Sequence, residues 1–167
     1  HALAGATVIC NPSASDETIG KAAYRELLLA SQSARLISAY LYADAGQGES
    51  STDMVYAGHN LIAENGVLLK QSRMFHPGLV TAELDLQYLS CERVRMNTFG
   101  FRENTHAKVP FVTAVRETPI ERFVDPAPFV PSDQAERDLR CEQILSIQAN
   151  GLAQRLRDRK RTRLNSS

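Results

Sequence analysis

The chain has 167 residues, enough for one domain with a hydrophobic core of ordinary size. Lys plus Arg number 19 and Asp plus Glu also number 19, so no net charge favours nucleic acid or an anionic membrane. No apolar run approaches the roughly 18 residues that a membrane-spanning helix needs, and no secretory leader pattern is present. We therefore expect a cytoplasmic protein with neither nucleic acid nor membrane as a partner.

The cysteines and histidines form no metal or disulfide motif. Cys10, Cys91 and Cys141 are far apart and lack CxxC spacing, and the four histidines contain no HExxH pattern. We expect no metal site and reduced thiols.

The first 42 residues have the pattern of a strand, a helix and a second strand. Ala6–Cys10 is a short apolar run typical of a buried strand, and Arg35–Tyr42 predicts the next one. Ser15 or Asp16 is placed to cap the helix between them. The apolar face of that helix is expected at Tyr24, Leu27, Leu28 and Ser31. About 35 residues is the size of a βαβ unit.

The middle of the chain predicts a loop, a hairpin and a short helix. Residues 43–53 contain Gly46 and Gly48 and form the loop. Residues 54–73 predict a strand, a kink and a hairpin whose turn contains Asn65-Gly66, because a type I′ turn needs positive φ twice. Residues 78–86 predict another strand, and Gln87–Arg95 a short amphipathic helix.

The last third predicts an extended linker and a long helix. Five prolines fall between residues 97 and 131, where periodicity is lost. A helix follows, with Asp133 and Glu136 as its capping pair. Its apolar stripe is Cys141, Ile144, Leu145, Leu152 and Leu156. The final residues, RKRTRLNSS, have no apolar period and are expected to lie outside any fold.

The TIGKA turn is not a phosphate-binding P-loop, because Ser15 and Ala22 occupy positions where that loop needs Gly and Ser or Thr. Ser15 instead follows a strand, where open α/β sheets place ligands. Lys21 lies near a helix N-terminus. Its ammonium group and the helix N-terminus could together bind an anion such as a carboxylate. On spacing alone, a capping serine and an exposed lysine remain the alternative.

Other reactive side chains give weaker signals. Cys10 ends an apolar strand, so we expect it to be buried in packing rather than to act as a nucleophile. His59 follows the expected kink and could reach a site, although a structural role is the simpler interpretation. Glu49, on a glycine-flanked loop, could orient an ammonium group or accept a proton, or could be a solvated acid.

Three stretches of the sequence carry a family resemblance. Residues 2–25, 33–66 (with GQGESSTD at 46–53) and 92–99 resemble the glutaminase domain of glutamine-dependent NAD synthetases. In that family a nitrilase-superfamily amidase is fused to an ATP-dependent synthetase. Residues 142–157, EQILSIQANGLAQRLR, resemble the opening helix of the synthetase domain, and FVPSD at 129–133 resembles the approach to it.

The resemblance implies an α/β fold, the C-terminal part of a nitrilase-like α-β-β-α sandwich. Residues 1–99 would be that half of the amidase, 100–131 the linker, and 132–158 the first synthetase helix. Residues 159–167 would be a tail foreign to the family. Because the chain starts at His1 rather than Met, we expect an internal fragment of a longer enzyme. By the resemblance, we expect the full-length enzyme to be a homo-oligomer.

The resemblance also implies a chemistry. A Cys attacks the side-chain amide of glutamine, a Glu acts as base and a Lys stabilises the oxyanion, and the ammonia aminates ATP-activated deamido-NAD. In the family this triad precedes the segment that matches Ala2, so we expect no catalytic residue here and an inactive fragment. ATP and magnesium belong to the synthetase domain, whose SGGxDS motif would follow Arg157, so this segment should bind no cofactor.

Two residues carry over as glutamine ligands, Ser15 and Lys21. Glu49 and Asp53 match a loop near the site or the domain contact, and their roles stay open. Another nitrilase-superfamily amidase, or a non-catalytic interaction module whose linker and final helix wrap a partner, are the alternatives.

Overall fold

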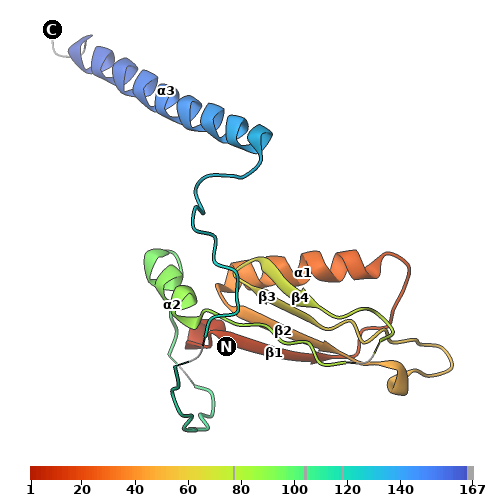
Figure 1. Ribbon diagram of the computed structural model, residues 1–167. Helices are drawn as coiled ribbons and strands as arrows, with labels where there is room; N and C mark the ends of the chain where they lie inside the picture. Colours follow the sequence, from red (N-terminus) through yellow and green to blue (C-terminus); the bar gives the residue numbers. More distant parts are fainter. Residues whose placement is uncertain (77, 104, 118, 165–167) are drawn as a thin grey trace. The chain divides into compact units, whose positions relative to one another are not determined.

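A computed structural model describes residues 1–76, 78–103, 105–117 and 119–164, with side chains up to Arg159. The chain divides into two units, His1–Arg122 and Phe123–Ser167. The first unit is mixed α/β (Figure 1). Its elements are η1 (Ala2–Ala4), β1 (Val8–Ser13), α1 (Lys21–Leu36), β2 (Ala39–Asp44), η2 (Gln47–Glu49), β3 (Leu61–Glu64), β4 (Val67–Gln71) and α2 (Leu86–Arg95).

The four strands form one sheet in the order β1-β2-β3-β4. β1 and β2 are parallel and joined by α1, whereas β2, β3 and β4 are antiparallel neighbours. The predicted strand–helix–strand unit is therefore present. Because β1 and β2 are parallel, their carboxyl ends, at Ser13 and Asp44, lie side by side.

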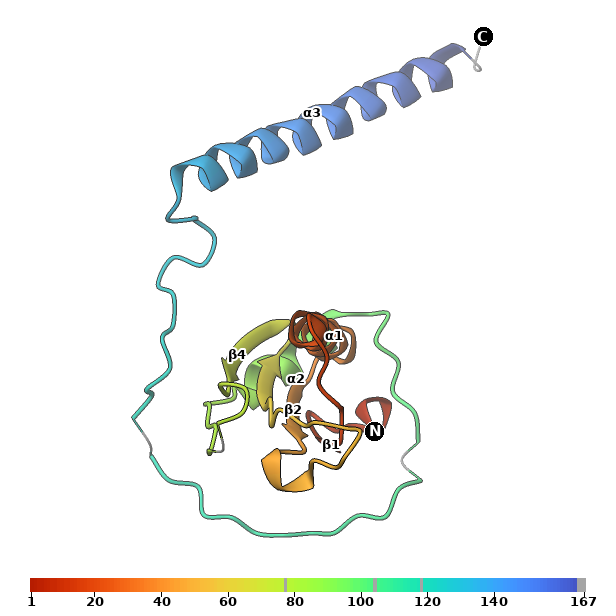
Figure 2. The same ribbon diagram turned by 90° about the vertical axis from the view of Figure 1, so that its right-hand side faces the viewer.

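The sheet buries side chains on both faces, in alternation along β2. On one face α1 packs over the strands (Figure 2), where Tyr42 and Leu61 meet Leu29 of α1. On the other face Ala39 packs with Ile37 and with Leu89 of α2.

The buried face of α1 differs from the predicted one. Tyr24 is 62% exposed, and Leu27, Leu28 and Ser31 are exposed as well. The buried stripe is Arg25, Leu29 and Ser33. Two of these three are polar, and the fold satisfies them internally: Ser33 Oγ, for example, donates to the carbonyl of Ser38 at 2.7 Å. A search for apolar periodicity therefore selects the wrong side of the helix.

The hairpin prediction is confirmed. β3 and β4 are joined by Asn65 and Gly66, which have φ values of 44° and 91°, as a type I′ turn requires. A Cβ atom on Gly66 would lie 3.1 Å from Cβ of Ala34, so the turn also packs closely against α1. Glycine is thus required here by both conformation and space.

Several predicted boundaries are wrong. β1 continues past Cys10 to Ser13, and α1 continues through Arg35 and Leu36 before Ile37, with φ of 45°, ends it. Of the strand expected after Met54, one isolated bridge forms, between Tyr56 and Asp16. Residues 78–85 form no strand. Their polar groups are used elsewhere, since Asp85 N–H donates to Glu64 at 2.6 Å and the Asp85 side chain caps α2.

Arg93 of α2 fixes the end of α1 from the opposite face of the sheet. It is 3% exposed, and its guanidinium donates to the carbonyls of Leu36, Ile37 and Ala6 at 3.1, 2.9 and 2.6 Å. The ring of Phe99 lies 4.9 Å from its central carbon. Burial lowers the pKa of Arg93. The negative end of the α1 dipole and three carbonyls thus hold a buried cation that has no carboxylate partner among the described residues.

The stretch predicted as a linker has neither helix nor strand in its described residues, and parts of it contact the rest of the first unit. The Arg102 N–H donates to the Leu3 carbonyl at 2.8 Å, and the ring centroid of His106 lies 4.4 Å from that of His1. The backbone N–H groups of Glu121 and Arg122 donate to Glu83. The Arg122 guanidinium lies 2.7 Å from the buried carboxylate of Glu64.

The second unit contains α3 (Gln134–Leu164). Its predicted cap is confirmed, because Asp133 accepts the N–H of Glu136 at 2.8 Å. The predicted apolar stripe is exposed, with Leu145 at 66%. The tail predicted from residue 159 to belong to no fold continues α3 as far as Leu164, and residues 165–167 lie outside the described residues. None of the helices in the described ranges is long and apolar enough to span a membrane.

Candidate functional site

The structure brings the two predicted ligand residues together. Ser15 follows β1 and Lys21 opens α1, and both line one open hollow of about 400 Å³ at the carboxyl end of the parallel strand pair. Asn11, Tyr24, Tyr40 and Tyr42 line it as well. The hollow therefore combines a hydroxyl group, an ammonium group and aromatic walls, which suits a small amphipathic ligand with a carboxylate.

Neither Ser15 nor Asp16 caps α1, contrary to prediction. The helix starts later, after Gly20 with φ of 84°, and no side chain from the described part of the chain caps it. The segment 14–20 is instead held by distant partners: Ser15 N–H donates to Asp44 Oδ1 at 3.0 Å, and Glu17 N–H to the Val55 carbonyl at 2.7 Å. The Ser15 side chain therefore does not cap the helix, and it lines the hollow instead.

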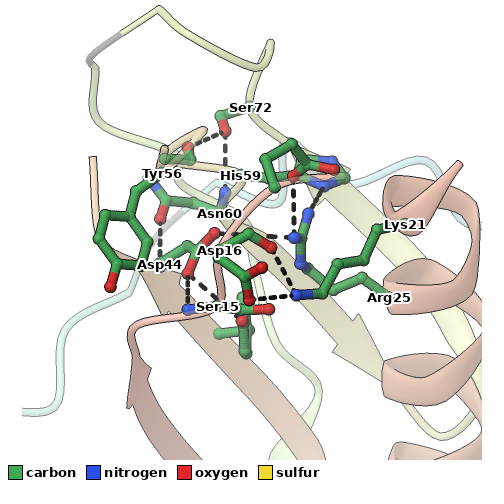
Figure 3. Close-up of polar contacts among 12 residues, drawn as sticks. Ser15, Asp16, Lys21, Arg25, Asp44, Tyr56, His59, Asn60 and Ser72 are labelled. Carbon is green, nitrogen blue, oxygen red and sulfur yellow. Dashed lines mark hydrogen bonds and ion pairs between the residues drawn. The ribbon is translucent and has the colours of Figure 1, made fainter. Parts of the chain in front are cut away.

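Lys21 is paired within the loop. Its Nζ lies 2.8 Å from Asp16 Oδ1 and also donates to the Asp16 carbonyl (Figure 3). The Lys21 hydrogen bond and charge hold the pKa of the Asp16 carboxyl below its ordinary value of 3.8. Both side chains are partly exposed, so a ligand carboxylate entering the hollow can share or replace this contact.

A buried polar cluster lies beneath this loop (Figure 3). Arg25, 3% exposed, lies 2.9 Å from Glu17 Oε2 and 3.9 Å from Asp44 Oδ2. It also lies 2.9 Å from His59 Nδ1, and His59 Nε2 lies 2.8 Å from Gln71 Oε1. Because a guanidinium can only donate, His59 Nδ1 accepts and the ring proton is on Nε2. Burial lowers the pKa of Arg25, but the contacts with Glu17 and Asp44 outweigh it and raise that pKa.

Sequence analysis missed Arg25, Glu17 and Asp44. The signal for Arg25 was its position one turn after Lys21, and for Asp44 its place at the end of β2. Asp44 is fixed in turn by Asn60, whose side chain accepts the Asp44 N–H at 2.9 Å, and Asn60 N–H donates to Ser72 at 2.9 Å. His59, for which a structural role was the simpler interpretation, is buried in this cluster.

The other candidate residues lie elsewhere. Glu49 and Asp53 are exposed on the loop after β2, and neither lines the hollow. Cys10 is exposed, so the expectation that it is buried is wrong: β1 is an edge strand, and alternation places Cys10 on the sheet face opposite Asn11 and Ser13, which line the hollow. Cys91 and Cys141 are exposed on helices. No group of three or more His, Cys, Asp or Glu could hold a metal within the described ranges.

Comparison with known proteins covers nearly the whole chain. The chain is 43% identical to the glutamine-dependent NAD(+) synthetase of Mycobacterium leprae and 42% identical to that of Mycobacterium tuberculosis, over 93% of its own length. Over that length the chain is similar to glutamine-dependent NAD(+) synthetases. The resemblance stated from the sequence is thereby confirmed. The chain spans about a quarter of the length of these curated synthetases, 25% in each case.

Among solved structures, a glutamine-dependent NAD(+) synthetase from Cytophaga hutchinsonii matches 44% of this chain and 13% of its own, with 38% identity and a TM-score of 0.42. The enzyme from Acinetobacter baumannii in complex with ADP matches 53% of this chain and 16% of its own, with 19% identity and a TM-score of 0.48. No family model matches the chain.

Proposed function

We propose that the chain is a segment of a glutamine-dependent NAD(+) synthetase and that its hollow holds the α-carboxylate end of glutamine. The observation that carries this proposal is the placement of Ser15 and Lys21 together in one hollow at the ends of β1 and β2. The identity of 42–43% to named synthetases supports the choice of substrate.

The residues divide the recognition of glutamine between them. The Lys21 ammonium attracts the α-carboxylate, and the first turn of α1, which no described side chain caps, adds the positive end of the helix dipole. Ser15 Oγ supplies a donor beside them. Tyr24, Tyr40 and Tyr42 line the hollow and would pack against the methylene groups of the substrate.

The rest of the reaction is assigned to parts of the synthetase outside this segment. A Cys, Glu and Lys triad would release ammonia from glutamine, and a synthetase domain using ATP and magnesium would transfer it to activated deamido-NAD. Residues 1–99 would then be part of a nitrilase-like α-β-β-α sandwich, 100–131 the linker and 132–158 the first synthetase helix. The exposed residues of β1 support the sandwich, because a second layer packed against that part of the sheet would bury them. We propose a cytoplasmic homo-oligomer.

The site is tested in a complete enzyme, the Mycobacterium leprae synthetase with its matching quarter replaced by this chain. Lys21→Ala should raise the KM for glutamine by about 10- to 100-fold, because it removes a charge-assisted contact to the carboxylate. NAD formation from added ammonia should be unchanged, since ammonia bypasses the glutamine site. Lys21→Arg, which keeps the charge, should recover most of the affinity. Equal loss of both activities, or an unchanged KM, would contradict the assignment.

A further inference from the structure

We propose that Arg25 is a positioning residue for substrate binding: through Glu17 and Asp44 it holds the segment 14–20 in the geometry that presents Ser15 and Lys21 to the hollow. This inference rests on the proposed glutamine site and extends it. Arg25 itself is 3% exposed, lies one helical turn after Lys21 and is among the residues that line the hollow.

The first connection runs through Glu17, which lies between Ser15 and Lys21 in the chain. Its carboxylate pairs with Arg25 at 2.9 Å, and the side chains of Arg25 and Glu17 are 4% and 10% exposed. Such a shielded, charge-assisted contact has a defined geometry, unlike an ion pair in open solvent. The Glu17 N–H is held as well, by the Val55 carbonyl. The centre of the segment is therefore fixed from both its side chain and its backbone.

The second connection runs through Asp44, which holds Ser15. Asp44 Oδ1 accepts the Ser15 N–H, whereas Oδ2 lies 3.9 Å from Arg25 and has no hydrogen-bond partner among the described residues. The Asp44 side chain is fully buried, and the Arg25 guanidinium is the positive charge beside it. A shift of Arg25 would thus disturb Ser15 through Asp44 and Lys21 through Glu17.

Arg25 also sets the charge around the hollow. Asp16, Glu17 and Asp44 are three acids near Ser15, and Lys21 and Arg25 are the cations paired with them. Without Arg25 the acids would outnumber the cations by two beside a site proposed to bind a carboxylate. Like charges disfavour an anionic ligand, so loss of Arg25 should weaken glutamine binding even where the fold persists.

The chain offers a matched control in Arg93. It is also 3% exposed, but it donates to backbone carbonyls at the other end of α1 and does not line the hollow. Replacing either arginine by lysine removes a planar, multidentate donor and should lower stability. Only the change at Arg25 should alter glutamine recognition.

The experiment uses the complete chimaeric synthetase described above and the variants Arg25→Lys, Glu17→Gln and Arg93→Lys. We expect Arg25→Lys and Glu17→Gln to raise the glutamine KM about tenfold, with ammonia-dependent NAD formation unchanged. Because Arg25 and Glu17 share one of these contacts, the double variant should show less than the product of the two effects. Arg93→Lys should lower the melting temperature and leave the glutamine KM unchanged.

An unchanged glutamine KM in folded Arg25→Lys, or an equal rise in Arg93→Lys, would overturn the positioning role. If Arg25→Lys does not fold, Glu17→Gln decides, because it keeps the shape of the side chain and breaks the ion pair with Arg25. Removing an acid from beside the hollow would by charge alone lower the glutamine KM, so a raised KM reports the loss of positioning. Lys21→Ala, measured in parallel, separates the two proposals. A raised KM in Lys21→Ala with no change in Arg25→Lys or Glu17→Gln refutes the positioning role alone, whereas an unchanged KM in Lys21→Ala refutes the glutamine site.

Discussion

Lys21 places a positive charge at the first position of α1, where the helix dipole disfavours a cation. Asp16 compensates, and the contact lowers the pKa of its carboxyl. A carboxyl whose pKa is lower in the folded chain adds stability above its ordinary pKa of 3.8, and this stability is lost as the pH falls through the folded-state value. We predict that Lys21→Met returns the Asp16 pKa to its ordinary value, measured by NMR titration of the carboxyl carbon. An Asp16 that titrates alike in both chains would contradict the pairing.

The residues of the site could be predicted only in part. Ser15 and Lys21 lie six positions apart on one turn, so their meeting is a local event that spacing can indicate. Arg25 meets His59 from 34 positions away, and Ser15 meets Asp44 from 29. Such contacts depend on the pairing of β1 with β2 and on the path of residues 54–60, and no local pattern encodes either. The same contacts explain why Ser15 and Asp16 do not cap α1.

At the scale of elements, Arg93 joins α2 to the end of α1 and the start of β1. We predict that Arg93→Met destabilises the fold by about 3 kcal/mol, because three buried carbonyls lose their donor. Urea unfolding of the wild-type and variant chains measures the change. Arg95→Met on the same helix is the control, since Arg95 is exposed and forms an ion pair with Glu92, and it should cost less than about 1 kcal/mol. Equal costs for the two variants would contradict the role of Arg93.

Local signals predicted the elements that depend on local chemistry. The Asn65-Gly66 turn, the helix at Leu86–Arg95 and the Asp133 cap are all present, because each is determined by backbone preference within a few residues. The strand predicted at 78–86 had suitable alternation, but a strand also needs a neighbour, and the backbone there pairs with side chains such as Glu64 instead. The buried face of α1 was mispredicted because Arg25 and Ser33 are polar residues that the fold itself satisfies.

At the scale of the whole chain, the hollow is lined by Ser15 and Lys21, the two proposed glutamine ligands, but by no cysteine of the described residues. We therefore expect the chain to bind glutamine without hydrolysing it. Of the cysteines, Cys10 is the one near the hollow in sequence, but it lies on the opposite face of the sheet, and a nucleophile must reach the substrate carbonyl at about 3 Å. We predict that the purified 167-residue chain releases no ammonia from glutamine, measured with a coupled ammonia assay at millimolar substrate. The complete Mycobacterium leprae synthetase serves as the positive control in the same assay. Ammonia release that copurifies with the chain and is lost in Cys10→Ser would show that Cys10 reaches the substrate after all. It would also mean that the sheet face assigned to Cys10 is wrong.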